Sequence, residues 1–163
     1  MGTLENFDLG EYGCDTFIET GTGRGEGLEY AKKFPFKQLY SFEINSHVFD
    51  VSQDAFDMRT QIFHSKSVDG LLQVLPLIQG KRILFWLDAH YPGADYGHAK
   101  YDAEPDMDVR LPLYRELETI IKHRGVKDVF IIDDVRIYDK GKIREYLPNV
   151  EFKDFDEGYA ICQ

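Results

Sequence analysis

The 163-residue sequence is short of the features that would assign it to several common classes of protein. It has only two cysteines, Cys14 and Cys162, which give neither a disulfide framework nor a metal-ligand spacing and are expected to be small core residues. No apolar run approaches the roughly 20 residues that a membrane-spanning helix needs. Residues 1–11 contain no basic stretch followed by an apolar one, as a secretory signal would. We therefore expect a cytoplasmic protein that does not enter a membrane.

Positive charge is scarce as well. The chain has 19 lysine and arginine residues against 29 aspartate and glutamate residues, for a formal net charge of −10. Proteins that bind nucleic acids usually carry a basic surface, because neutralising phosphates supplies much of their affinity. Neither a nucleic acid nor an anionic membrane is therefore expected as the main partner, which leaves a small molecule as the expected ligand.

Apolar and aromatic residues are plentiful, at 43% and 14%, which is enough for one packed domain over residues 1–163. Segments typical of strands alternate with segments typical of helices. The predicted strands are 15–19, 38–44, 60–63, 82–87 and 126–132, and the predicted helices are 27–34, 46–56, 68–79, 111–123 and 141–146. Residues 150–155 and 158–162 are predicted to form an antiparallel C-terminal strand pair. This order predicts an α/β fold, with a Rossmann-like, doubly wound, mostly parallel sheet and helices on both faces.

A glycine-rich turn, Glu19-Thr20-Gly21-Thr22-Gly23-Arg24-Gly25, lies between the first predicted strand and the first predicted helix. Glycines allow the backbone to turn tightly and to approach a ligand closely. Glu43, at the end of the next strand, can accept hydrogen bonds from both hydroxyls of a ribose. The candidate residues of a nucleoside-binding site are Glu19, Thr20, Gly21, Thr22, Gly23, Gly25 and Glu43.

The turn favours one cofactor over another. A dinucleotide fingerprint would need a third glycine where Glu26 stands. Glu19 would also place a negative charge beside a pyrophosphate, which disfavours NAD-dependent redox chemistry. The same charge suits S-adenosyl-L-methionine, which carries an ammonium and a sulfonium group.

The turn resembles motif I of the class I S-adenosylmethionine-dependent methyltransferases, and Phe42-Glu43 is similar to the acid that ends their second strand. The resemblance covers roughly residues 15–162 and implies that Gly21 and Gly23 border the methionine part of the cofactor. It also places residues 64–71 beside the adenine. Ser65, Lys66 and Ser67 are the candidates for that contact, although Lys66 stands where the family often has an acidic residue.

Three carboxylates follow the fourth and fifth predicted strands. Asp88 directly follows the segment 82–87, and Asp133 and Asp134 directly follow the segment 126–132. These strand ends are neighbours in a doubly wound sheet, so the carboxylates would repel one another unless a cation neutralises them. Mg²⁺ and Mn²⁺ prefer such oxygen ligands.

This arrangement is similar to that of the metal-dependent O-methyltransferases of the catechol and macrolide-sugar type. The similarity implies that Asp88, Asp133 and Asp134 bind the metal ion. His90 is the candidate general base beside Asp88, because its ordinary pKa lies near neutrality. The reaction would be methyl transfer to a hydroxyl oxygen of a small molecule or sugar, and a homodimer is compatible with it.

Other interpretations stay open at this point. Asp133 can cap the following turn, Asp88 can contact the cofactor ammonium without a metal, and His90 can have a structural role. Asp134 can pair with Arg136, Arg110 or Arg115. At the level of function, the alternatives are a metal-dependent hydroxylase-like enzyme of the same fold and a non-catalytic nucleoside-binding domain. The long irregular segment 91–110 is expected to border the substrate pocket.

Overall fold

The computed structural model describes residues 4–52, 57–124, 128–156 and 158–163, and it has the predicted α/β fold. The strands are β1 (Thr16–Thr20), β2 (Gln38–Glu43), β3 (Thr60–His64), β4 (Ile83–Leu87), β5 (Val129–Ile132), β6 (Glu151–Lys153) and β7 (Tyr159–Cys162). The α-helices are α1 (Glu26–Ala31), α2 (Ser46–Ser52), α3 (Ser67–Val74), α4 (Met107–Arg110), α5 (Leu113–His123) and α6 (Lys140–Tyr146). The 3₁₀ helices are η1 (Leu4–Asn6), η2 (Leu9–Tyr12), η4 (Leu75–Ile78) and η5 (Val135–Ile137).

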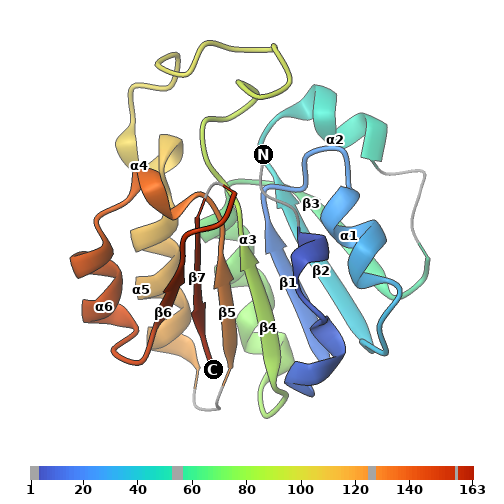
Figure 1. The fold of residues 1–163 in the computed structure, drawn as a ribbon. Coiled ribbons are helices and arrows are strands. Elements are labelled where there is room, and N and C mark those ends of the chain that lie inside the picture. The colour runs from blue at the N-terminus through green and yellow to red at the C-terminus, as the bar shows by residue number, and fades with distance from the viewer. Residues whose placement is uncertain (1–3, 53–56, 125–127, 157) are drawn as a thin grey trace.

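The seven strands form one sheet in the order β3-β2-β1-β4-β5-β7-β6 (Figure 1). Strands β1 to β5 pair in parallel, and β7 runs antiparallel to both β5 and β6. The predicted parallel sheet and the predicted antiparallel C-terminal pair are both confirmed. The strand order reverses between β1 and β4, and ligands of open α/β sheets bind beside such a point, outside the carboxyl ends of the strands.

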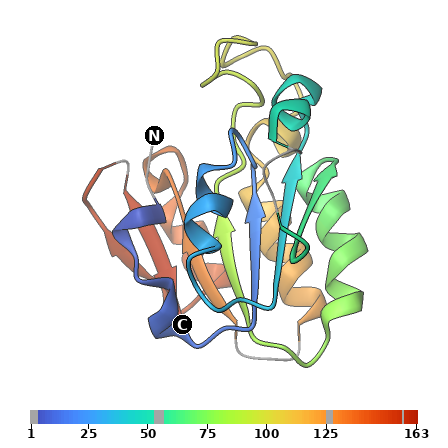
Figure 2. The same cartoon turned by 90° about the vertical axis from the view of Figure 1, so that its right-hand side faces the viewer.

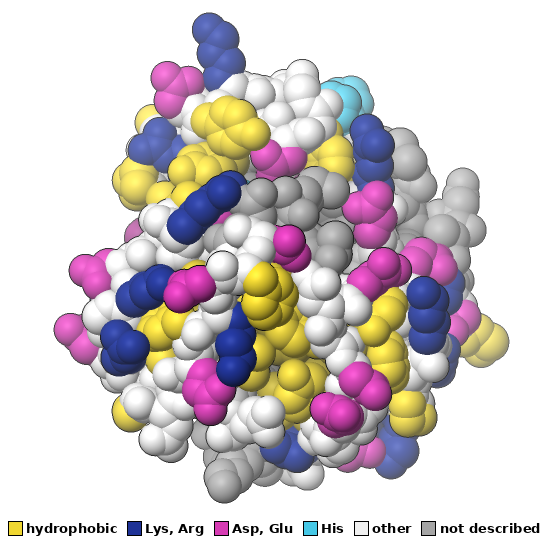
Figure 3. All heavy atoms as spheres, in the orientation of Figure 1, with side chains coloured by type: hydrophobic (Ala, Val, Ile, Leu, Met, Phe, Trp, Pro, Cys, Tyr) yellow, Lys and Arg dark blue, Asp and Glu magenta, His cyan; other side chains and the backbone are white. Residues whose placement is uncertain are grey.

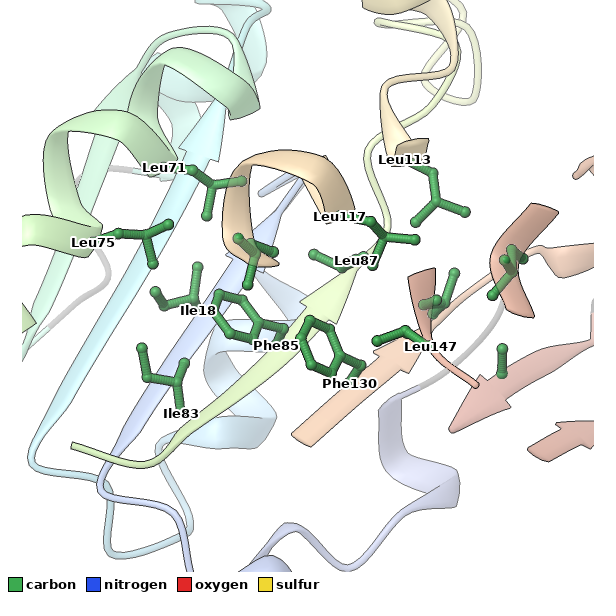
Figure 4. Close-up of a cluster of buried hydrophobic side chains, with 14 of the residues drawn as sticks. Ile18, Leu71, Leu75, Ile83, Phe85, Leu87, Leu113, Leu117, Phe130 and Leu147 are labelled. Carbon is green, nitrogen blue, oxygen red and sulfur yellow. The ribbon is translucent and has the colours of Figure 1, made fainter. Parts of the chain in front are cut away.

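Helices and turns cover both faces of the sheet (Figure 2), so the central strands β1, β4 and β5 are buried along their whole length. On one face, Leu71 and Leu75 meet Leu117 of α5 and the side chains of the central strands (Figure 4). On the other face, η1, η2 and α1 pack their apolar residues against Phe17 and Trp86. The two cores fix the central strands, and with them the residues that follow those strands.

Several boundaries differ from the predicted ones. The predicted helix 68–79 is two elements, because the α-helical part ends at Val74 and continues as η4, which has Pro76 in its first turn. A proline inside a helix lacks the N–H for the i→i−4 bond and clashes with the preceding turn, so the helix tightens there. Residues 53–56 of the predicted helix 46–56 and residues 126–127 of the predicted strand 126–132 lie outside the described residues. The helices η1, η2, α4 and η5 were not predicted.

Within the described ranges, no helix is long and apolar enough to cross a membrane. Figure 3 shows acidic and basic side chains interspersed over the face that it presents. Both cysteines are free thiols, each packed at the margin of one of the two cores.

Candidate active site

A pocket of about 1190 Å³ lies at the carboxyl ends of the central strands. Segment 91–110 arches above these strand ends (Figure 1, yellow) and supplies part of the wall. The pocket brings together most of the candidate residues from the sequence, namely Glu19, Gly21, Thr22, Gly23, Glu43, Ser65, Lys66, Ser67, Asp88, His90, Asp133 and Asp134. Thr20 and Gly25 do not line it, because Thr20 is fully buried beneath the turn and Gly25 is the N-cap of α1.

The glycine-rich turn has the backbone conformation that its sequence predicts. Gly21, Gly23 and Gly25 have φ angles of 79°, 53° and 83°, in the left-handed region that side chains other than glycine rarely adopt. A Cβ on Gly21 would lie 3.0 Å from the carbonyl oxygen of Asp88, so the turn also passes directly against the chain that follows β4. The backbone N–H groups of Gly21 and Thr22 donate to the carbonyl oxygen of Phe42, at 3.0 and 3.2 Å, which joins the turn to β2.

Glu43 is fixed at the end of β2. Its Oε2 accepts a hydrogen bond from the N–H of Gly23 at 3.0 Å, and its Oε1 accepts one from the N–H of Asn45 at 2.8 Å. Burial raises the pKa of Glu43, and these backbone donors oppose the rise. Each carboxylate oxygen keeps a second lone pair. The side chain can therefore accept two further hydrogen bonds from a ligand in the pocket.

Glu19 is more deeply buried than its predicted role suggests, with 1% of its surface exposed. Its Oε2 accepts a hydrogen bond from the hydroxyl of Ser41 at 2.7 Å, and Ser41 in turn contacts the hydroxyl of Thr22 at 2.7 Å. Its Oε1 occupies the space that a side chain at Gly27 would fill. Burial raises the pKa of Glu19 to about 8, so Glu19 is largely neutral at pH 7. A cation bound beside it would favour the charged form.

The acids after β4 and β5 surround His90. Its Nδ1 lies 3.5 Å from Oδ1 of Asp88, and its Nε2 lies 3.5 Å from Oδ2 of Asp95 and 3.6 Å from Oδ2 of Asp134. Burial lowers the pKa of His90, but the surrounding carboxylates outweigh burial, so the net shift is upward. The imidazole is therefore protonated at a higher pH than an exposed histidine.

Asp88 and Asp133 interact directly. Burial, followed by the charge of Asp133, raises the pKa of Asp88 well above its usual range, and burial also raises the pKa of Asp133. The two carboxyl groups therefore titrate together, and each loses its proton at a higher pH than an exposed aspartate does.

Asp134 takes one of the structural roles that the sequence left open, whereas Asp133 does not cap the following turn, because η5 has no side-chain cap hydrogen bond. Asp133 accepts a hydrogen bond from the backbone N–H of Asp134. Asp134 pairs with Arg136 at 2.9 Å and has a φ angle of 51°, in the left-handed region that aspartate adopts more often than most residues other than glycine. Across the described ranges, no three histidine, cysteine or acidic side chains are arranged to hold a metal ion.

Besides Asp95, two residues of this region were missed in the sequence. Tyr96, from segment 91–110, lies on the glycine-rich turn, where its hydroxyl is hydrogen-bonded to the backbone of Arg24 and the Arg24 guanidinium lies 5.4 Å from its ring. Glu116 of α5 is buried below the pocket beside Thr20 and Ser67, and neither of its carboxylate oxygens has a partner of good geometry among the described residues. Burial raises the pKa of Glu116 to about 7. Its position among Leu113, Leu117 and Ile120 on one helix face was a signal in the sequence.

The fold is that of the class I S-adenosylmethionine-dependent methyltransferases. Human methyltransferase-like protein 13, solved in complex with SAH, superposes on 91% of this chain and 71% of its own, with a TM-score of 0.61 and 14% identity. A protein of Staphylococcus aureus described as a caffeoyl-CoA O-methyltransferase superposes on 93% of this chain and 76% of its own, with a TM-score of 0.56 and 15% identity.

The fibrillarin/Nop5p complex contains a chain of which 75% superposes on 97% of this one, with a TM-score of 0.59 and 8% identity. No family model matches the sequence, and no curated protein matches it. At these identities, the likeness is one of fold.

Proposed function

We propose that the chain binds S-adenosylmethionine in the pocket above β1, β2 and β4 and transfers its methyl group to a small molecule. The observation that carries the proposal is the joining of the glycine-rich turn to Glu43 at the switch point of a methyltransferase fold. The residues present fit the cofactor: Gly21 and Gly23 line the pocket in the turn conformation that glycine allows, and Glu43 offers two fixed acceptor oxygens to a ribose.

The proposed chemistry requires the protein mainly to align the acceptor with the methyl group of the cofactor. The cofactor supplies an electrophilic methyl group on a sulfonium. Glu43 would orient the ribose, Glu19 would lie beside the ammonium, and Ser65, Lys66 and Ser67 would border the adenine. Holding the acceptor in line with the methyl group supplies much of the acceleration. His90 is positioned to accept a proton from the acceptor, but its raised pKa confines that role to pH values above this pKa.

Isothermal titration calorimetry with S-adenosylmethionine and S-adenosylhomocysteine tests the proposal. Both should bind, and Glu43→Ala should weaken binding by about 100-fold, since it removes two charge-assisted hydrogen bonds. Glu43→Gln, which keeps one acceptor oxygen, should bind with an affinity between those of the wild type and Glu43→Ala. Glu145→Ala, at an exposed position of α6, serves as the matched control and should bind like the wild type. If neither compound binds the wild-type protein, the proposal is wrong.

The narrower hypothesis of Mg²⁺-assisted transfer to a hydroxyl is a separate proposal. Among the described residues, Asp88, Asp133 and Asp134 are not arranged to hold a metal ion, and Asp134 pairs with Arg136. We expect methyl transfer to survive chelation of divalent ions, and loss of transfer on chelation with recovery on adding Mg²⁺ would restore the metal hypothesis.

A further inference from the structure

One wall of the pocket combines acidic and aromatic side chains. The acids are Asp88, Asp95, Asp133 and Asp134, and the aromatic residues are Tyr91 and Tyr101. The acids come from the ends of β4 and β5 and from segment 91–110, so residues distant in the sequence converge on one place. We call these six residues the acidic–aromatic wall.

The wall contains a buried acceptor that nothing in the described protein satisfies. Asp133 is 3% exposed and lines the pocket, yet its Oδ1 has no hydrogen-bond partner among the described residues. A buried polar atom without a partner costs free energy that a bound donor can recover. Because a carboxylate oxygen accepts hydrogen bonds and carries negative charge, the group that best completes this site is a positively charged donor.

The position of His90 supports the same conclusion. Its imidazole faces Asp88, Asp95 and Asp134 together, but its nitrogens stay 3.5 to 3.6 Å from their oxygens. These distances are longer than those of good N–H···O hydrogen bonds, so the histidine leaves the acceptors incompletely satisfied. The acids can therefore bind a second cation that enters from the pocket.

The two tyrosines of the wall make it suited to an organic cation rather than to a cation without carbon. The Tyr91 and Tyr101 rings meet edge to face with their centroids 5.1 Å apart, and the Tyr101 hydroxyl donates to Oδ1 of Asp95 at 2.8 Å. This bond ties the aromatic part of the wall to its acidic part. The faces of aromatic rings attract ammonium groups, and their apolar area packs against carbon.

We infer that the methyl acceptor is a small organic amine, positively charged in solution, whose ammonium group binds at Asp133 and Asp134 while its carbon skeleton packs on Tyr91 and Tyr101. For transfer, the ammonium gives one proton to a carboxylate of the wall, and the nitrogen lone pair then forms the bond to the methyl carbon. The sulfur–methyl bond breaks at the same time, and S-adenosylhomocysteine leaves. The inference rests on the proposed methyl transfer and narrows its acceptor. It concerns the acidic–aromatic wall, whereas the glycine-rich turn and Glu43 would hold the nucleoside.

The test uses the full chain saturated with S-adenosylhomocysteine, so that the cofactor's own ammonium group is already bound. Calorimetry or NMR titration then compares amines with isosteric alcohols and carboxylates on three frameworks: 2-phenylethyl, cyclohexylmethyl and n-butyl. On at least one framework, the amine should bind about ten-fold more tightly than the alcohol, and the carboxylate more weakly than both. High salt should reduce the preference for the amine.

Variants separate the wall from its surroundings. Asp133→Asn and Asp95→Asn should each reduce the preference for the amine several-fold and leave alcohol binding unchanged. Asp95 is a second probe because it lies on segment 91–110 rather than in the core, so its substitution does not threaten folding. Asp102→Asn, an exposed residue of the same segment that does not line the pocket, is the matched control and should retain the preference.

Three results would overturn the inference: no preference for the amine on any framework, a preference that survives both substitutions, or displacement of S-adenosylhomocysteine by the amine. Failure of the proposed function is a different result, namely that S-adenosylhomocysteine itself does not bind. In that case the same amine series titrated into the free protein still decides whether the acidic–aromatic wall binds cations.

Discussion

The hydroxyl of Tyr96 occupies the space that a side chain at Gly23 would need. Gly23 belongs to the turn after β1, whereas Tyr96 belongs to the segment after β4, so this contact joins the two sides of the pocket. Burial raises the pKa of Tyr96 to about 12, which keeps its hydroxyl protonated at every physiological pH. The turn therefore requires glycine at this position for its backbone angle and also for its neighbour.

These two requirements can be separated by substitution. Gly23→Ala should lower the free energy of unfolding by about 2–3 kcal/mol, from left-handed strain plus overlap with Tyr96. Gly97→Ala is the control and should show the strain alone, because Gly97 has a φ angle of 72° and a Cβ there would meet no atom of the described residues within 4 Å. In urea unfolding, adding Tyr96→Ala to Gly23→Ala should remove the extra loss of stability that Gly23→Ala shows over Gly97→Ala. Equal losses for Gly23→Ala and Gly97→Ala would refute the contact.

Glu116 makes stability depend on pH. Its pKa is about 7 in the folded protein against an ordinary 4.5, so between these values the unfolded chain is ionised while the folded protein holds a proton. The free energy of unfolding should fall as pH rises through this window and level off above it. Glu116→Gln should remove up to about 3 kcal/mol of this dependence, at about 1.4 kcal/mol per pKa unit.

Urea unfolding at pH 4.5, 6 and 8 measures this effect as the difference between the wild type and Glu116→Gln. The two proteins should be closest at pH 4.5, with the variant gaining on the wild type toward pH 8. Glu145→Gln, at an exposed position on α6, should follow the wild type at every pH. A difference independent of pH would mean that Glu116 is not protonated in the folded state.

Glu19 should couple cofactor binding to the release of a proton. With a pKa of about 8, Glu19 holds its proton at pH 7, and a cationic group bound beside it favours the ionised form. Binding of S-adenosylmethionine at pH 7 should release up to about one proton. Calorimetry in buffers of different ionisation enthalpy counts the protons released. The Glu19→Gln variant should release none from this site, and an unchanged count would place the ammonium elsewhere.

A buried ion pair at the amino ends of β4 and β5 should contribute far more to stability than the exposed ion pairs do. Arg124 and Asp128 lie 2.7 Å apart with side chains 5% and 2% exposed, and Asp128 also accepts the N–H of Ile83 at 2.9 Å. Asp128→Asn should cost about 3–5 kcal/mol in urea unfolding, because it leaves the buried guanidinium without its counter-charge. Asp154→Asn, which breaks the exposed pair with Lys140, should cost less than about 1 kcal/mol. Similar costs for the two variants would contradict this assignment.

The sequence predicted the parts of the site that depend on local pattern. Apolar runs mark the central strands, so the polar residue that follows each run falls at the same edge of the sheet. Glu43, Asp88 and Asp133 are placed by this reasoning, and the three glycines of the turn by their spacing. Strand ends are set by a few residues of chain, which is why these positions could be read without a structure.

The remaining features depend on contacts between distant segments. Nothing in the sequence around Tyr96 or Asp95 indicates that one lies on Gly23 and the other beside His90. Glu19 is protonated because neighbouring strands and helix α1 bury it. The only sign of this burial in the sequence is the nearby Gly27, which leaves room for the Glu19 side chain. The charge of a carboxylate is a property of its surroundings, and those surroundings are assembled by the fold.

The position of β7 has a consequence for the order in which the chain can fold. This strand is the last in the sequence, yet it lies between β5 and β6, and Phe7 near the start of the chain packs against its Tyr159 with ring centroids 5.1 Å apart. During synthesis, the edge of β5 and the apolar residues around Phe7 stay uncovered until residues 159–162 have left the ribosome. Until then the nascent chain presents an open strand edge, the kind of surface that associates with other chains and that chaperones shield.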